Sequence, residues 1–158
     1  SVSSRTGMNL NYETVKELKQ IPNIVGIKEA SADIAQIVEI AQLVDENFAL
    51  YSGNDDQVLP LLAVGGAGVI STISNILPKE TATMVHNFLD GNIAQARTTQ
   101  LKQLPLIQAV FSEVNPVPIK AAVSLLGKCE LSYRLPLAEP EEETLTNLKT
   151  QMTDYGLL

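Results

Sequence analysis

The sequence has 158 residues, of which 45% are apolar, enough to bury one hydrophobic core. The net charge of −7 and the lack of a basic cluster argue against nucleic acid as a partner. No apolar stretch is long enough to cross a bilayer, so we expect no membrane partner either. Because Cys129 is the only cysteine and no secretory leader opens the sequence, we expect the protein in the cytoplasm.

Helix and strand patterns alternate over the first half of the sequence. Turn residues separate short apolar runs, and the apolar residues of the helical stretches recur every three or four positions. In chain order the pattern predicts a helix over 12–18, a strand over 24–27, a helix over 34–44, a strand over 48–51, a helix over 55–64 and a strand over 68–71. Strands separated by helices are typical of βαβ units, so we expect a parallel sheet.

Caps and breakers mark where the helices begin and end. Asn11 and Asp33 stand where their side chains can cap a helix N-terminus, and the pair Gly65-Gly66 ends a helix. After Ser71 only helices are predicted, and they run from Pro78 to about Leu89, from Asn92 to Phe111, from Pro116 to Leu126 and from Pro140 onward. We therefore expect an all-helical C-terminal region.

The three predicted strands leave two folds open. Parallel sheets are normally covered by helices on both faces, and a complete (β/α)8 barrel takes about 250 residues. The sequence is therefore compatible with a small open sheet or with part of a barrel.

Lys28 carries the clearest chemical signal. It follows the apolar run 24–27, at the carboxyl end of a strand that we expect to be buried. Desolvation disfavours the charged form of an amine, and a neutral lysine amine attacks carbonyl groups to form a Schiff base. The alternative is a lysine that reaches back to water or protects an exposed strand edge.

Two further segments follow predicted strands, where the functional loops of parallel α/β proteins gather. Gly53 and Asn54 come after the second strand, and Gly53 can let a backbone carbonyl approach a ligand closely. Ile70 lies at the end of the third strand. The glycine-rich run 65–68 precedes a strand, whereas a phosphate-binding loop follows one, so we expect no nucleotide site there.

Arg5 lies in the stretch 4–7, which we expect to be a loop. A planar guanidinium can bind a carboxylate through two parallel hydrogen bonds, and a solvated surface arginine is the alternative. We expect no metal site, because His86 and Cys129 have no companions at the spacing of metal ligands.

Several of these segments together resemble a known superfamily. Gly26-Ile27-Lys28-Glu29-Ala30-Ser31 is similar to the Schiff-base lysine segment of the dihydrodipicolinate synthase and N-acetylneuraminate lyase superfamily. Gly65-Gly66-Ala67-Gly68-Val69-Ile70-Ser71 is similar to its G-x-x-G-x-I-S segment, and 51–55 and 115–120 resemble a strand-end turn and a helix start in it. The resemblance covers essentially the whole chain. It implies the C-terminal portion of a (β/α)8 TIM barrel over residues 1–78, with about three parallel strands, and barrel-closing and C-terminal helices over 79–158.

The resemblance also implies an activity. Ser4-Arg5-Thr6-Gly7 points to the dihydrodipicolinate synthases, in which the arginine binds the carboxylate of aspartate semialdehyde. Lys28 would form an imine with pyruvate, and the derived enamine would condense with L-aspartate-4-semialdehyde to 4-hydroxy-tetrahydrodipicolinate, in lysine and diaminopimelate biosynthesis. Gly53, Asn54 and Ile70 would line the pocket. The imine takes the place of a cofactor, and the resemblance implies a homo-oligomer.

The resemblance has gaps as well. In the family the preceding half supplies the tyrosines of a proton relay and the threonines that hold the pyruvate carboxylate, and residues 1–3 read Ser-Val-Ser in place of Asn-Val-Pro. We therefore expect this chain alone not to perform the condensation. Two alternatives stay open: a non-catalytic half-barrel that self-associates, and a related pyruvate-dependent aldolase acting on sialic acid or a 2-keto-3-deoxy sugar acid.

Overall fold

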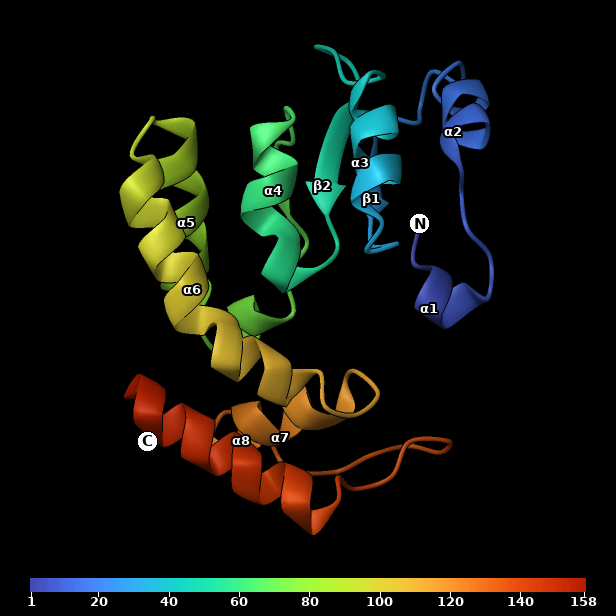
Figure 1. The fold of residues 1–158 in the computed structure, drawn as a ribbon. Coiled ribbons are helices and arrows are strands. Elements are labelled where there is room, and N and C mark those ends of the chain that lie inside the picture. The colour runs from blue at the N-terminus through green and yellow to red at the C-terminus, as the bar shows by residue number, and fades with distance from the viewer. The chain divides into compact units, whose positions relative to one another are not determined.

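Three parallel strands form the sheet of the protein (Figure 1). The computed structural model describes residues 1–158 and places strands β1 (Gly26–Glu29), β2 (Ala49–Ser52) and β3 (Gly68–Val69) in the order β1-β2-β3. Lys28 lies opposite Tyr51, and Tyr51 lies opposite Gly68. The prediction of three parallel strands is confirmed.

All three strands differ in extent from the prediction, and β2 runs over Ala49–Ser52 in place of 48–51. β1 begins at residue 26 because the amide of Ile24 is engaged in a turn with the carbonyl of Ile21, at 2.9 Å, and pairing can start only after that turn. β3 is shorter than the expected 68–71, because its partner β2 ends at Ser52. The last ladder bond runs from the Ile70 amide to the Ser52 carbonyl at 2.8 Å.

The chain forms two compact units. The first comprises residues 1–71 and 85–93, and the second comprises residues 72–84 and 94–158. The predicted division into 1–78 and 79–158 concerns the barrel and its closing helices, and it stays a prediction.

The first unit contains α1 (Ser3–Thr6), α2 (Tyr12–Leu18), α3 (Ile34–Ala41), the 3-10 turn η1 (Asp55–Gln57) and α4 (Val58–Ala63). The Asn11 side chain accepts a hydrogen bond from the Thr14 amide at 3.0 Å, and Asp33 accepts from the Ala35 amide at 2.9 Å. Both predicted N-caps are therefore confirmed, although α3 ends three residues before the expected end.

The stretch 4–7, expected to be a loop, contains most of the helical turn α1. The Gly7 amide closes this turn on the Ser3 carbonyl at 2.9 Å, and Gly7 takes a φ of 66°, a left-handed conformation that glycine adopts without steric cost. Arg5 thus lies in a defined turn.

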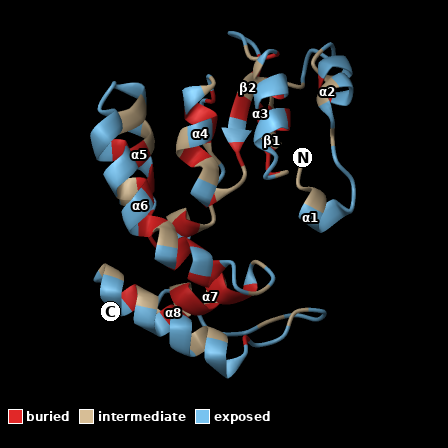
Figure 2. Cartoon of the chain, in the orientation of Figure 1, coloured by how far each residue is buried: buried red, intermediate tan, exposed pale blue.

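One face of the sheet is covered by α2, α3 and α4 (Figure 2). The buried side chains of this core come from β1, β2 and the surrounding helices: Val15, Ile27, Ile37, Ile40, Leu43, Phe48, Leu50 and Leu61. Burial alternates along β1, so Ile27 and Glu29 are buried while Lys28 between them is half-buried. Successive side chains of a strand point to opposite faces, and Lys28 therefore lies on the face that α2 and α3 leave open.

The second unit is helical. It contains η2 (Ile73–Asn75), the first half of α5 (Pro78–Leu89), nearly all of α6 (Ile93–Val110), α7 (Val117–Leu125) and α8 (Glu142–Tyr155). Its core includes Leu106 and Val110 of α6, Ala122 of α7, and Leu148 and Met152 of α8. The expected all-helical C-terminal region is confirmed, and no helix of the chain is both long and apolar enough to cross a membrane.

Candidate active site

The residues predicted from strand ends gather at the carboxyl edge of the sheet. Lys28 is at the end of β1, and Gly53 and Asn54 directly follow β2. Ile70 directly follows β3 with its side chain half exposed. The parallel register places Lys28 beside Tyr51 and puts Gly68 next to Tyr51 on the same face. The sheet thus presents an amine among apolar neighbours on an open surface.

Gly53 packs directly against the side chain of Lys28. A Cβ atom at position 53 would lie 2.8 Å from Cε and 3.1 Å from Cγ of Lys28, and 2.6 Å from Cβ of Ala30. The Gly53 amide also donates to the Glu29 carbonyl at 2.7 Å, which continues the ladder between β1 and β2. Glycine at this position therefore makes room for the methylene chain of the lysine. Contact of Gly53 with a substrate stays a prediction.

Ser52 shapes the turn that carries Gly53 and Asn54. Its buried hydroxyl donates to the Asn54 carbonyl at 2.8 Å and accepts from the Asn54 amide at 3.2 Å. The Asn54 side chain in turn donates to Oε1 of Gln57 at 3.2 Å. The turn is thus held by its own polar groups, a typical device of serine at strand ends.

The N-terminal segment pairs with β1 next to Lys28. The nitrogen of Ser1 donates to the Lys28 carbonyl, and the Ala30 amide donates to the Ser1 carbonyl at 2.9 Å. This is the bonding pattern of a parallel strand pair, with Ser1 opposite Glu29. Arg5 follows four residues later, so its Cα lies within about 15 Å of that of Ser1. Figure 1 shows α1 beyond the carboxyl end of β1, with the exposed Arg5 on it.

Sequence reasoning missed Tyr51 and Glu29 as members of this region. The sequence patterns place Tyr51 in a strand and in the strand-end turn 51–55, whereas the pairing of two parallel strands sets it beside Lys28. Glu29 was read only as part of a motif, yet its side chain is 1% exposed. The alternation Ile27, Lys28, Glu29 was the available signal, because it puts the carboxylate on the face of the buried isoleucine.

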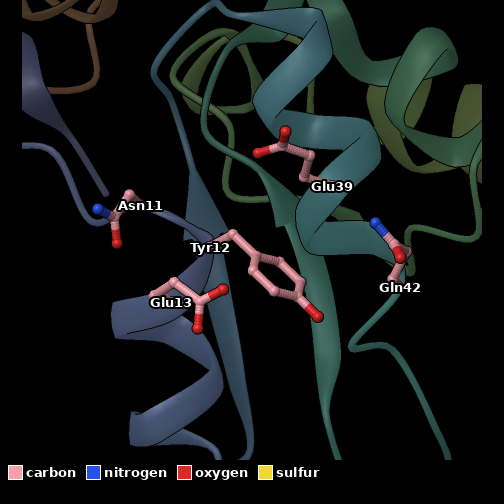
Figure 3. Close-up of a pocket in the computed structure, with 5 residues that line it drawn as sticks. All are labelled: Asn11, Tyr12, Glu13, Glu39 and Gln42. Carbon is pink, nitrogen blue, oxygen red and sulfur yellow. The ribbon is translucent and has the colours of Figure 1, made fainter.

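A separate hollow of about 390 Å³ lies between the start of α2 and the end of α3. Asn11, Tyr12, Glu13, Glu39 and Gln42 line it, and Figure 3 shows the Tyr12 ring between Glu13 and Gln42, with Glu39 on the neighbouring helix. It belongs to the helical layer, which packs on the face opposite Lys28, and contains none of the predicted site residues. No group of three or more histidine, cysteine, aspartate and glutamate side chains is placed to hold a metal ion.

Comparison with known proteins identifies the family. Residues 1–155 match the sequence model of the Dihydrodipicolinate synthetase family. The chain belongs to this family. A 4-hydroxy-tetrahydrodipicolinate synthase from Caldicellulosiruptor bescii is 51% identical over 157 residues, which are 99% of this chain and 53% of that protein. The chain thus spans about half the length of the curated relatives that it matches.

Solved structures of the family share the fold. Dihydrodipicolinate synthase from Thermotoga maritima superposes with a TM-score of 0.96 at 40% identity, over 100% of this chain and 55% of that one. A chloride-inhibited synthase from Acinetobacter baumannii, complexed with pyruvate, gives a TM-score of 0.94 at 33% identity, over 100% of this chain and 54% of that one. The expected fold, part of the TIM barrel of these synthases, is confirmed.

Proposed function

We propose that Lys28 is the Schiff-base lysine of a dihydrodipicolinate synthase. The observation that carries the proposal is the contact of Lys28 with Gly53 at the carboxyl edge of a parallel sheet, where the active sites of such barrels lie. Membership of the family supports it, as does the pyruvate in the complex of the Acinetobacter baumannii relative.

The proposed chemistry starts at the amine of Lys28. Its nitrogen attacks the keto carbon of pyruvate, and loss of water gives an imine. Loss of a proton from the methyl carbon then gives an enamine, whose carbon forms a bond with the aldehyde carbon of L-aspartate-4-semialdehyde. The amino group of the semialdehyde displaces Lys28 as the ring closes to 4-hydroxy-tetrahydrodipicolinate. The lysine is thereby returned, and the imine serves as the electron sink.

The other site residues have distinct proposed roles. Arg5 holds the carboxylate of the semialdehyde, for which its exposed guanidinium offers two parallel donors. The backbone around Gly53, Asn54 and Ile70 lines the pocket at the strand ends. The exposed side chains of Tyr51 and Ile70 lie on the face of Lys28 and are available to a substrate, and the homo-oligomer is proposed from the family resemblance. Sedimentation of a monomer at every protein concentration would contradict the proposed oligomer.

The proposed imine can be trapped chemically. Borohydride added with pyruvate should raise the mass of the protein by that of pyruvic acid less one oxygen atom, since reduction makes the imine a stable amine. Lys28→Ala should abolish the adduct, and Lys102→Ala, which removes a lysine of the helical second unit, should leave it unchanged. An equal yield from Lys28→Ala and the unchanged protein would refute the proposal.

A further inference from the structure

A buried carboxylate lies directly beside the proposed catalytic lysine in the sequence. Glu29 is 1% exposed, and no lysine or arginine pairs with it among the ion pairs of the chain. Its Oε1 accepts from the Ser31 amide at 2.6 Å, and its Oε2 accepts from Nε2 of Gln36 at 3.2 Å. Burying a carboxylate without hydrogen bonds destabilises the folded state, and these two donors offset that cost for Glu29.

Gln36 extends this arrangement to Asn9. The two side-chain amides bind each other reciprocally: Nδ2 of Asn9 donates to Oε1 of Gln36 at 2.6 Å, and Nε2 of Gln36 donates to Oδ1 of Asn9 at 3.1 Å. A carboxylate accepts hydrogen bonds and donates none, so Glu29 requires Gln36 to present its nitrogen. That choice orients the amide of Asn9 in turn, and Oδ1 of Asn9 also accepts from Oγ of Ser1 at 3.0 Å.

The network ties both ends of one short segment to β1. At the first end, the backbone of Ser1 pairs with Lys28 and Ala30, on either side of Glu29. At the second end, Asn9 reaches Glu29 through Gln36. The segment between these two ends contains α1 and therefore Arg5.

We propose that Glu29 is a positioning residue that, through Gln36 and Asn9, fixes the Arg5 segment relative to Lys28. It contacts neither substrate. Its carboxylate sets the direction of the amide chain, and the amide chain holds the segment that carries the guanidinium. The inference rests on the proposed function for the roles of Arg5 and Lys28. It adds the interactions that hold the Arg5 segment at a fixed position relative to Lys28.

The direction of the hydrogen bonds provides the test. Glu29→Gln leaves one acceptor for two donors, the Ser31 amide and Nε2 of Gln36, and Gln36→Glu places two carboxylates together. The double variant with both substitutions restores one donor facing one acceptor between positions 29 and 36. Its glutamate at 36 still accepts from Nδ2 of Asn9, but it no longer donates to Oδ1 of Asn9. Hydrogen exchange of the amides of residues 4–10 is measured in the 158-residue chain, with those of α8 as the reference.

We expect each single substitution to speed exchange in residues 4–10 by about tenfold or more relative to α8, since a hydrogen bond to a charged group is lost. The double variant should exchange more slowly than Gln36→Glu, because one donor and one acceptor replace two facing carboxylates, and faster than the unchanged chain, because the bond to Oδ1 of Asn9 is lost. Unchanged exchange in the single variants, or a double variant that exchanges as fast as Gln36→Glu, would overturn the proposal.

If the buried single variants do not fold, Asn9→Ala tests the same link from its exposed end. It should speed exchange in residues 4–10 while leaving α3 and α8 protected, and unchanged exchange there would overturn the proposal. Pyruvate trapping on the unchanged chain is scored separately. A missing adduct there contradicts the proposed function, whereas exchange of residues 4–10 does not depend on the adduct.

Discussion

Gly53→Ala is the substitution for which the structure gives the sharpest expectation. The added methyl would lie 2.8 Å from Cε of Lys28 and 2.6 Å from Cβ of Ala30. Carbon atoms pack favourably at about 3.5–4.0 Å, so the two groups must separate by about 1 Å. The contact with Ala30, which is held by its pairing with Ser1, is relieved only by a shift of the backbone, and the flexible side chain of Lys28 has to move as well.

A displacement of this size has two measurable consequences. A misplacement of about 1 Å can lower the rate of an oriented reaction by about 100-fold, so we expect imine formation with pyruvate to slow by about 10- to 100-fold. Overpacking should lower the free energy of unfolding by about 1–3 kcal/mol. The assay is the initial rate of borohydride-trapped adduct, measured by intact mass over a range of pyruvate concentrations, with urea unfolding in parallel.

Gly68→Ala is the matched control on the neighbouring strand. A Cβ there would meet the Tyr51 ring at 3.7 Å, an ordinary contact, and no left-handed φ is required. We expect its trapping rate to stay within about twofold of the unchanged chain. If Gly53→Ala traps pyruvate as fast as Gly68→Ala while remaining folded, the packing of Gly53 does not position the lysine.

Three further predictions test the site and the two units. Arg5→Ala should leave the rate of pyruvate trapping within about twofold, because the guanidinium serves the second substrate, and loss of the adduct would contradict that role. The Lys19 ammonium, hydrogen-bonded to Asp45, lowers the pKa of that carboxyl. The stability that this pair contributes is thus present above the unfolded pKa of about 3.9 and is lost as the pH falls through the lower folded value. The difference in unfolding free energy between the protein and Asp45→Asn should therefore be seen at pH 7 and shrink below about pH 4, and a difference that grows on acidification would contradict this sign. Leu148→Ala, at a fully buried position, should cost about 2–5 kcal/mol in urea unfolding, whereas Leu101→Ala, at a position 61% exposed, should cost about 0.5 kcal/mol or less; equal losses would show that the core is misassigned.

The helix starts could be predicted from the sequence because their causes are local. Asn11 and Asp33 each bond to amides two or three residues away, and such bonds follow from residue type and spacing. The start of α5 at Pro78 has the same local origin, since proline fixes the φ that a first helical residue needs. The strand ends depended instead on partners far along the chain. β3 stops where Ser52 stops, and no pattern within residues 68–71 contains that information.

The candidate site also contains residues that local sequence predicts and contacts that only the fold creates. Lys28 could be predicted because the signal is local: a charged residue follows the apolar run 24–27. The contact of Gly53 with Lys28 could not, since it joins residues 25 positions apart through the register of two strands. The network of Glu29, Gln36 and Asn9 also spans distant segments, with Asn9 and Gln36 separated by 27 positions. Polar residues in such a network look like surface residues until the fold buries them.

The central claim is that Lys28, among all the lysines of the chain, is the amine that reacts with pyruvate. Peptide mapping of the borohydride-reduced protein by tandem mass spectrometry tests it most directly, because it reads the position of the adduct residue by residue. We predict a single modified peptide, with the added mass on Lys28 of β1. An adduct spread over the exposed lysines, or its absence from Lys28 in the folded protein, would contradict the claim.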